Sequence, residues 1–412
     1  MRSTADLPRL LDESVQEDPY SFYRALRESD PVHYDDQTSA YLITRHADVA
    51  AAYRNPVFST QNYEWQLEPV MGRTLLQLDG QEHARTRALV GPHFRGAGLA
   101  RWSPIIERNV AALLEGAAEA GADALTAGMA VGEEVDVVTR FAHYLPVYVI
   151  ADMLALPKSD HARFYSWYTA QSDFLSNLGA DPEVDARGRA VMAEMRHYLR
   201  PIVAERRGRP GDDLISVLAN AEVDGETLDD AAVITHVTHL LNAGSETTDR
   251  TIANLLLHLL TRRELFEAVR EDRTLTTAAI GETLRLTPPS QLNGRVATQD
   301  VDVCGRTIPS GAFAMLVIAS ANRDERRFDQ PDSFDLWRTD MAHDKAFTSV
   351  GEHFAFGHGR HFCLGAMVAK VELETSLNIL LDRFPTMRLA DGPVPVSRGI
   401  KMRSPVSLRV VL

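Results

Sequence analysis

The sequence predicts a mostly α-helical protein with small β-sheets, and three observations support this fold class. A helical pattern runs from about Leu228 to Leu260, where apolar residues recur every three or four positions. A second helical pattern follows Cys363. Residues 296–303 and 312–318 instead form short segments bounded by turn residues, which predicts strands.

The N-terminal stretch Pro31–Ile43 predicts a further strand and turn. The chain has 412 residues, of which 45% are hydrophobic, enough for a large buried core. No linker rich in proline and glycine divides it, so we expect a single domain over residues 1–412.

Charge and hydropathy exclude two classes of partner. The net charge of −14 argues against binding to nucleic acid. The longest apolar-rich stretch, Tyr144 to Pro157, is interrupted by Asp152 and is too short to span a bilayer. The first residues, Met1 to Pro8, lack the hydrophobic segment of a signal peptide, so we expect a cytoplasmic protein that does not bind membranes.

Cys363 lies in the most informative segment, a glycine-containing turn at residues 356–365 that precedes the second helical pattern. At a helix start, backbone N–H groups and the helix dipole stabilise a thiolate. The two glycines before it allow a tight turn, and the rings of Phe356 and Phe362 are suited to exclude water. We therefore expect Cys363 to be a metal ligand. The alternative is a buried, inert cysteine.

The other cysteine, Cys304, precedes Gly305 in a strand-like segment and is most simply a structural residue. A disulfide between the two cysteines is not expected in a reducing compartment.

The turn resembles the haem-binding loop of cytochrome P450 enzymes, a pattern carried here by Phe356, Gly359, His361, Cys363 and Gly365. The resemblance implies that Cys363 is the proximal thiolate ligand of the iron. A dinucleotide-binding loop is excluded, because the run lacks a third glycine and does not follow a strand.

The long helical pattern is interrupted by a small, polar run, Ala243 to Thr248. Glycine costs about 1 kcal/mol in a helix interior, and hydroxyl side chains compete for backbone carbonyls, so the helix is expected to open locally. The alternative is a polar patch that faces another helix or a trapped water.

This run resembles the central helix of the same family, which lies across the distal face of the haem. The resemblance implies that Ala243 and Gly244 make room for dioxygen and that Leu240 lines the pocket. It also implies that Glu246 and Thr247 form an acid–alcohol pair that delivers protons during oxygen activation.

Glu282 and Arg285 stand three residues apart, a spacing that is uninformative by itself. In the cytochrome P450 family such a pair anchors the segment leading to the thiolate loop. The usual third arginine is absent, because serine stands at position 333. Arg338 and Arg323 are both candidates for it.

His83 and Arg87 stand four residues apart and share a face if their segment is helical. By themselves they suggest only a solvated helix face. Their segment, however, resembles the family segment that binds the haem propionates. Arg295 resembles another propionate ligand, and His361 is a further candidate. The guanidinium plane suits a carboxylate because it donates paired hydrogen bonds.

The resemblance covers most of the chain and implies the triangular haem-thiolate fold and a soluble, bacterial-type monooxygenase. Such an enzyme inserts one atom of O2 into an apolar organic substrate by hydroxylation or epoxidation, as in natural-product tailoring. It implies haem b as cofactor, and electrons that come from NAD(P)H through a separate ferredoxin or flavodoxin and its reductase. A peroxide-dependent peroxygenase and a non-catalytic haem-binding protein are the alternatives.

The same analogy places several residues at the border of the substrate pocket. They are Tyr63, Trp65, Leu240, Leu292 and Ile400. These side chains do not identify the substrate.

Overall fold

Helices dominate the secondary structure, which confirms the predicted fold class. The computed structural model describes residues 7–115, 129–177, 180–223 and 225–412, so the N-terminal residues 1–6 that bear on a signal peptide lie outside it. The described chain forms two compact units. The first unit comprises residues up to Asn62, Arg250–Ala366 and Arg388–Leu408, and the second comprises Tyr63–Asp249, Met367–Met387 and Arg409–Leu412.

The first unit contains the larger sheet and short helices. Its helices are α1 (Glu13–Glu17), α2 (Pro19–Ser29), α3 (His46–Arg54), α15 (Arg263–Glu271), α16 (Thr276–Leu286) and α17 (Ile318–Ala321). Its strands are β1 (Val32–Asp35), β2 (Ala40–Ile43), β3 (Phe58–Ser59), β7 (Leu292–Ala297), β8 (Val301–Val303), β9 (Arg306–Ile308), β10 (Phe313–Val317), β11 (Arg388–Leu389), β12 (Ser397–Arg398) and β13 (Ser404–Pro405).

The second unit is almost entirely helical. Its helices are α5 (Glu68–Met71), α6 (Gly80–Val90), α7 (Gly96–Ala100), α8 (Ser103–Glu115), α9 (Leu145–Met153), α10 (His161–Leu175), α11 (Pro182–Gly208), α12 (Leu214–Asn220) and α13 (Asp230–Ala243). Helix α4 (Asn62–Gln66), helix α14 (Glu246–Thr261) and helix α18 (Ala366–Arg383) span the boundaries of the units. The strands of the second unit form two pairs. They are β4 (Glu134–Asp136) with β14 (Arg409–Val411) and β5 (Glu222–Val223) with β6 (Glu226–Thr227).

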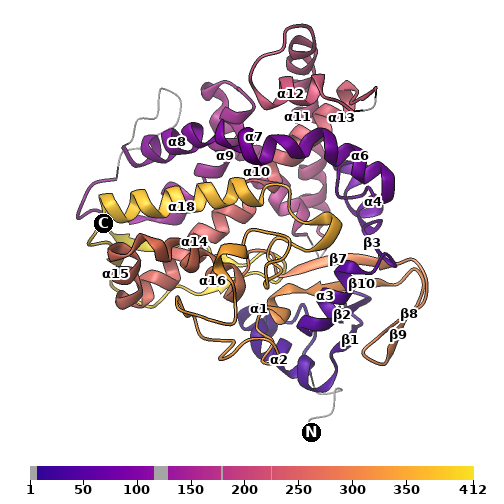
Figure 1. Cartoon of the computed structure of the whole chain (residues 1–412), viewed down its shortest axis with the longest axis vertical. Helices are drawn as coiled ribbons and strands as arrows, with labels where there is room; N and C mark the ends of the chain where they lie inside the picture. The colour runs from indigo at the N-terminus through magenta and orange to yellow at the C-terminus, as the bar shows by residue number, and fades with distance from the viewer. Residues whose placement is uncertain (1–6, 116–128, 178–179, 224) are drawn as a thin grey trace. The chain divides into compact units, whose positions relative to one another are not determined.

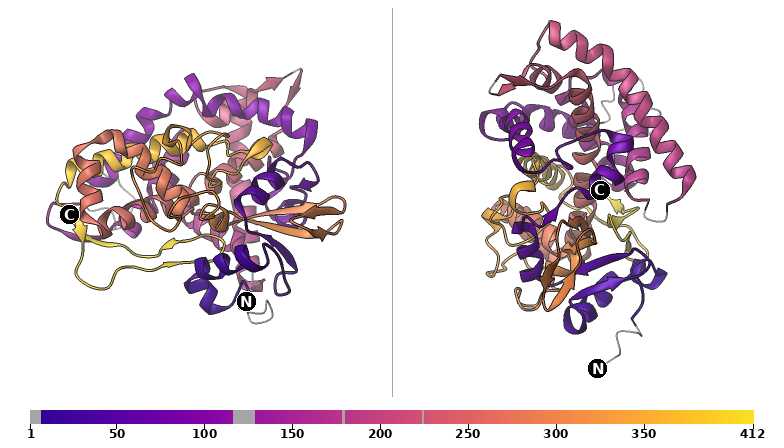
Figure 2. Two further views of the ribbon diagram at one scale, coloured as in Figure 1. Left: turned by 60° about the horizontal axis from the view of Figure 1, so that its bottom comes forward. Right: turned by 90° about the vertical axis from the view of Figure 1, so that its right-hand side faces the viewer.

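The main sheet of the first unit has the strand order β1-β2-β10-β7-β3, with β10 parallel to β2 and the other pairs antiparallel (Figure 1). The prediction of a single strand at residues 296–303 is wrong. It is the end of β7, a turn, and then β8, because Thr298 to Asp300 leave the sheet: the Asp300 carboxylate accepts a hydrogen bond from the Ser310 amide at 2.8 Å. Strands β8 and β9 form a hairpin that extends beyond the sheet (Figure 2).

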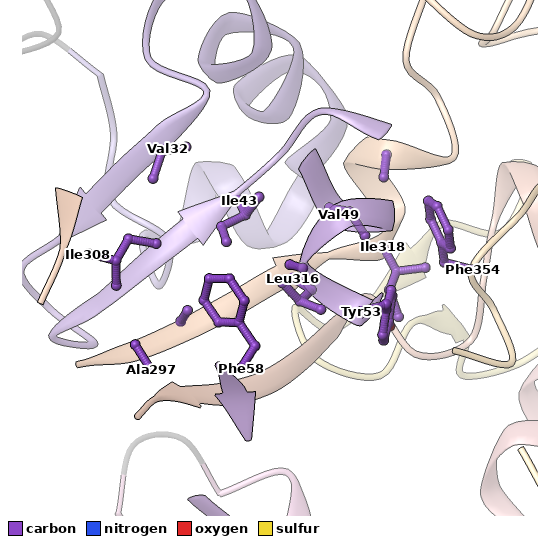
Figure 3. Packing of buried hydrophobic residues seen from close by; sticks show 13 residues of the cluster. Val32, Ile43, Val49, Tyr53, Phe58, Ala297, Ile308, Leu316, Ile318 and Phe354 are labelled. Atoms are coloured by element: carbon purple, nitrogen blue, oxygen red, sulfur yellow. The ribbon is translucent and has the colours of Figure 1, made fainter. Parts of the chain in front are cut away.

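Both faces of this sheet are buried, because successive side chains of a strand point to opposite faces. Ala314 and Leu316 of β10 join a first core with α3, and Met315 and Val317 join a second core with α1 and α2. Figure 3 shows the first core. Its members are Val32, Ile43, Val49, Ala52, Tyr53, Phe58, Ala297, Ile308, Ala314, Leu316, Ile318, Ala321 and Phe354.

The helical pattern at residues 228–260 forms two helices, and the predicted interruption is confirmed. Helix α13 begins at Asp230 because the Asp229 side chain caps it, accepting a 2.7 Å hydrogen bond from the Ala232 amide. It ends at Ala243, and α14 begins at Glu246 after a two-residue turn. None of the helices in the described ranges has the length and apolar character needed to cross a membrane.

Candidate functional site

The Cys363 loop is held by backbone hydrogen bonds and by glycines. Gly357 and Gly359 adopt φ angles of 68° and 69°, which other residues rarely adopt. The Cys363 amide donates a 2.8 Å hydrogen bond to the Phe356 carbonyl, and the Phe362 amide donates one of 3.1 Å to Gly359. The predicted glycine-shaped turn is therefore present.

The helix after the loop begins later than expected, since α18 starts at Ala366 and Leu364 and Gly365 form a turn. Cys363 is thus three residues ahead of the helix, because its own amide closes the loop onto Phe356. Its side chain is exposed, while Phe356 and Phe362 are half-buried with ring centroids 6.2 Å apart. A Cβ placed on Gly365 would meet no atom within 4 Å, so the space beside the loop is open.

Tyr53 connects this loop to the main sheet, and no sequence pattern predicts this contact. A Cβ on Gly359 would lie 3.0 Å from the Tyr53 carbonyl oxygen, so the loop can approach α3 only with glycine there. The Tyr53 hydroxyl accepts a 2.8 Å hydrogen bond from the Asn293 amide group of β7. Tyr53 also packs against Phe354, which precedes the loop (Figure 3).

Arg295 lies two residues after Asn293 on β7, hence on the same face of the sheet. Its guanidinium is 5.2 Å from the centroid of the Tyr53 ring, and it donates a 2.7 Å hydrogen bond to the Gly294 carbonyl. The residue is only 6% exposed, yet in the part of the chain that the structure describes no carboxylate pairs with it. A buried guanidinium of this kind suits an anionic ligand group.

The other expected propionate ligands occupy both units. In the first unit, His361 is half-buried, and its Nε2 lies 3.5 Å from the Thr60 hydroxyl. In the second unit, His83 and Arg87 both belong to α6, one turn apart, which confirms the helical spacing assumed for them. His83 is buried and Arg87 is half-buried.

Glu246 begins α14 in the second unit and is only 4% exposed. Its Oε1 accepts a 2.5 Å hydrogen bond from the hydroxyl of Ser172 on α10. One turn later, Asp249 accepts hydrogen bonds from Tyr168 of α10 at 2.9 Å, and its Oδ2 lies 2.8 Å from His143 Nδ1. Two carboxylates in the first turn of α14 are favourable because the N-terminal end of a helix is electropositive.

Thr247, the second residue of the expected pair, is half-buried, and its hydroxyl lies 3.4 Å from the Ala243 carbonyl. Ala243 is exposed and Gly244 is half-buried. A Cβ on Gly244 would approach the Cδ1 atom of Ile150 of α9 to 2.9 Å, so the absence of a side chain allows close packing here. The small residues therefore keep one side of the turn open and the other tightly packed.

The buried ion pair of α16 is present, and it resolves the choice between the two candidate arginines. Arg285 donates two 2.7 Å hydrogen bonds to Glu282. Arg338 contacts both carboxylate oxygens of Glu282 as well, at 3.1 and 3.2 Å. Arg323 instead bonds the Leu286 carbonyl and Asp332.

The expected pocket-lining residues lie in different environments. Leu292 and Ile400 are buried together in the second core of the first unit. Tyr63 and Leu240 are half-buried, and Trp65 on α4 is 59% exposed. Cys304 is in the β8–β9 turn with a φ of 50° and is exposed, not part of a strand as expected. The two cysteines do not form a disulfide with each other.

Comparison with known proteins gives a consistent result. A family model described as "Cytochrome P450" matches residues 184–398. The chain is 36% identical over its whole length to pulcherriminic acid synthase of Bacillus subtilis, covering 99% of that protein. It is 33% identical to erythromycin C-12 hydroxylase of Saccharopolyspora erythraea, covering 93% of this chain and 91% of that one.

Solved structures agree with these relatives. Cytochrome P450 CYP109Q5 from Chondromyces apiculatus superposes with a TM-score of 0.85 at 28% identity, over 98% of this chain and 97% of that one. Cytochrome P450 TbtJ1, solved without ligand, gives a TM-score of 0.84 at 33% identity, over 95% and 96% of the two chains. The similarity thus extends over almost all of both the sequence and the fold.

Proposed function

Because the chain belongs to the cytochrome P450 family and is a haem-thiolate monooxygenase, we propose that it inserts one oxygen atom of O2 into an apolar organic natural product. The reaction would be a hydroxylation or an epoxidation, since relatives are named as a hydroxylase and as epoxidases. The observation that carries the proposal is the exposed thiol of Cys363 on a glycine-shaped loop, in a chain that matches a curated family member over its full length.

Cys363 is the proposed axial ligand of haem b. Its backbone amide is bonded to the Phe356 carbonyl, which fixes the loop, while its side chain stays accessible to a ligand. No protein atom lies within 4 Å of a Cβ placed on Gly365, so the protein does not fill the space directly beside the loop. When bound, the haem supplies the activation of dioxygen, and a thiolate ligand favours cleavage of the O–O bond.

Four side chains are proposed to bind the haem propionates. They are His83, Arg87, Arg295 and His361. Arg295 has the strongest support, because a guanidinium buried without a protein carboxylate is stabilised by an anionic ligand. The residues present therefore fit the cofactor that the family uses.

Glu246 and Thr247 are the proposed catalytic residues. Glu246 would carry protons on its carboxylate, where Ser172 already donates a hydrogen bond to Oε1. Thr247 would use its hydroxyl, now 3.4 Å from the Ala243 carbonyl, to hold a water in the proton path. Ala243 and Gly244 would leave room for dioxygen on the open side of the turn.

The electrons are proposed to come from NAD(P)H through a separate ferredoxin or flavodoxin with its reductase, and the enzyme to act in the cytoplasm. A requirement for these electron donors distinguishes a monooxygenase from a peroxide-dependent peroxygenase and from a non-catalytic haem protein. Relatives named for erythromycin, epothilone and cyclomarin support a role in secondary metabolism.

The test starts from the reduced protein under carbon monoxide, which should give the strongly red-shifted Soret band of thiolate ligation. Cys363→Ala should abolish this band, and Cys304→Ala is the matched control, because Cys304 is the other exposed cysteine. Persistence of the band in Cys363→Ala would contradict the assignment. Turnover with NAD(P)H and redox proteins, compared with peroxide alone, then distinguishes the monooxygenase from the two alternatives.

A further inference from the structure

One face of the helix–turn–helix at α13 and α14 is accessible along a narrow stripe. Between Val233 and Asp249, five residues are accessible and every other residue is buried. The five residues, which we call the accessible stripe, are His239, Leu240, Ala243, Gly244 and Thr247. Their spacing places them on one side of a helix. The accessible stripe therefore includes Thr247, the hydroxyl-bearing residue of the proposed catalytic pair.

His239 differs chemically from the rest of the accessible stripe. Leu240, Ala243 and Gly244 are apolar or lack a side chain, and the Thr247 hydroxyl is directed at the Ala243 carbonyl. His239 is the stripe's only ring and its only titratable group. Its Nδ1 is buried, and no hydrogen-bond partner for it exists among the described residues.

His239 is only partly accessible, and the burial of its ring determines its charge state. Burial, with a smaller contribution from His236 nearby, lowers the pKa of His239 to about 4, so the imidazole is neutral at physiological pH. A neutral imidazole offers one N–H donor and one nitrogen acceptor. It complements ketones, amides and hydroxyls, whereas a carboxylate or an ammonium group would be poorly matched in a desolvated position.

Packing alone does not explain why histidine stands at position 239. A buried ring nitrogen without a hydrogen bond is destabilising, and leucine would fill a similar volume without that cost. The unmet hydrogen-bonding capacity of Nδ1 is explained if the partly accessible ring turns on substrate binding and this nitrogen then faces the bound molecule. His236, three residues earlier, is 5% exposed and lies outside the accessible stripe.

We propose that His239 is a specificity-determining residue that hydrogen-bonds a neutral polar group, a ketone, amide or hydroxyl, on an otherwise apolar substrate. This inference rests on the proposed function, since the substrate must lie along the accessible stripe close to Thr247. The apolar part of the molecule would contact Leu240 and Ala243, and the polar group would fix its orientation.

The test uses four probes that share the same twelve-carbon ring and differ in their polar group. They are cyclododecane, cyclododecanone, cyclododecanol and cyclododecanecarboxylate. Their dissociation constants are measured for the haem-loaded protein from the spectral shift on binding. The ketone or the alcohol should bind wild type about tenfold more tightly than the hydrocarbon, as expected for one sheltered hydrogen bond, and the carboxylate should have no such advantage.

His239→Leu should reduce that preference to about twofold or less, and His239→Asn, which keeps a donor and an acceptor, should retain most of it. His236→Leu is the matched control and should leave the preference unchanged. Equal binding of hydrocarbon, ketone and alcohol to wild type, a preference that survives His239→Leu, tighter binding of the carboxylate, or no binding of any probe up to its solubility limit would overturn the proposal.

The carbon monoxide spectrum separates this result from a failure of the proposed function. If wild type lacks the red-shifted band, the proposed function fails, whatever the probes do. If the band is present in wild type and in all three variants while the preference does not depend on residue 239, only the role of His239 fails.

Discussion

The Arg338 guanidinium reaches Glu282 across 56 residues of sequence, with its Nε 3.1 Å from one carboxylate oxygen and 3.2 Å from the other. Arg285 also donates to both oxygens of this carboxylate, and Glu282 and Arg285 are fully buried. Arg285 also donates to the carbonyls of Asn322, Pro331 and Ser333. The network therefore fixes an irregular part of the chain that has little regular secondary structure of its own.

We predict that Arg338→Ala destabilises the protein by about 3 kcal/mol, because removing one partner leaves part of a buried charge uncompensated. Equilibrium unfolding in urea measures this change. Arg263→Ala is the control, since its pair with Glu267 is at the surface and is worth less than about 1 kcal/mol. Equal effects of the two substitutions would contradict the buried role of Arg338.

Removing the proposed propionate ligands should weaken haem binding without changing the thiolate. Each sheltered, charged hydrogen bond contributes about 1.5–3 kcal/mol, so haem should leave Arg87→Ala/Arg295→Ala at least tenfold faster than wild type. The rate is measured by transfer of haem to an apo-globin acceptor. Arg306→Ala, an exposed arginine that pairs with Asp30, serves as control. An unchanged rate in the double variant would contradict the assignment.

Thr247→Ala should retain haem and substrate binding but lose the hydroxyl that holds water in the proton path. NAD(P)H would then be consumed with more of the electrons appearing as hydrogen peroxide and fewer as product. The measurement is peroxide and product formed per NAD(P)H oxidised. Thr248→Ala is the neighbouring control, because Thr248 is buried outside the accessible stripe. If Thr247→Ala forms as much product per NAD(P)H as wild type does, Thr247 has only a packing role.

The Ser172 hydroxyl should support catalysis through Glu246, to which it donates its 2.5 Å hydrogen bond. We expect Ser172→Ala to lower the rate of product formation about tenfold, the equivalent of one hydrogen bond to a charged group, and to increase the solvent isotope effect. Ser172→Thr keeps the hydroxyl and should restore the rate. A loss of activity that threonine does not rescue, or an unchanged isotope effect, would indicate a structural role only.

Glu372 on α18 should make the stability of the protein pH-dependent. Burial raises the pKa of its carboxyl well above the usual 4.5, so over the pH range just above 4.5 the folded protein keeps a proton that the unfolded chain releases. The free energy of unfolding therefore decreases as the pH rises from about 4.5 toward the pKa of Glu372 in the folded protein. Glu372→Gln should raise the Tm more at pH 8 than at pH 5, measured by calorimetry.

Glu374→Gln provides the comparison for that measurement, because Glu374 is two residues away and lies near Lys370 at 3.8 Å with 27% of its side chain exposed. Its effect on Tm should vary little between the same two pH values. A Glu372→Gln effect that does not depend on pH would show that the buried carboxyl is not protonated in the folded state.

Local patterns account for the parts of the fold that were predictable from the sequence. Apolar periodicity located α13 and α14, and Gly244 and Ser245 marked the break between them. The shape of the Cys363 loop followed from glycines adjacent in sequence. Strand ends were less predictable, as the division of residues 296–303 between β7 and β8 illustrates, because backbone hydrogen bonds to distant residues set them.

Tertiary contacts explain what the sequence could not reveal. Ser172 contacts a carboxylate 74 residues later, and Tyr53 contacts Asn293 240 residues later, so neither has a local signature. The choice between Arg338 and Arg323 depended on the path of an irregular segment, which periodicity does not describe. The roles given to Cys363, Glu246 and Thr247 came from family resemblance, since single residue types do not specify chemistry.

The exposure of both cysteines has a practical consequence for preparing the enzyme. A thiol reagent should titrate two equivalents per chain in cofactor-free protein, at Cys304 and Cys363. Once the sulfur of Cys363 is engaged by iron, only the thiol in the β8–β9 turn should remain reactive. The stoichiometry of labelling under native conditions would thus report the loaded fraction of a preparation without any optical signal from the chromophore.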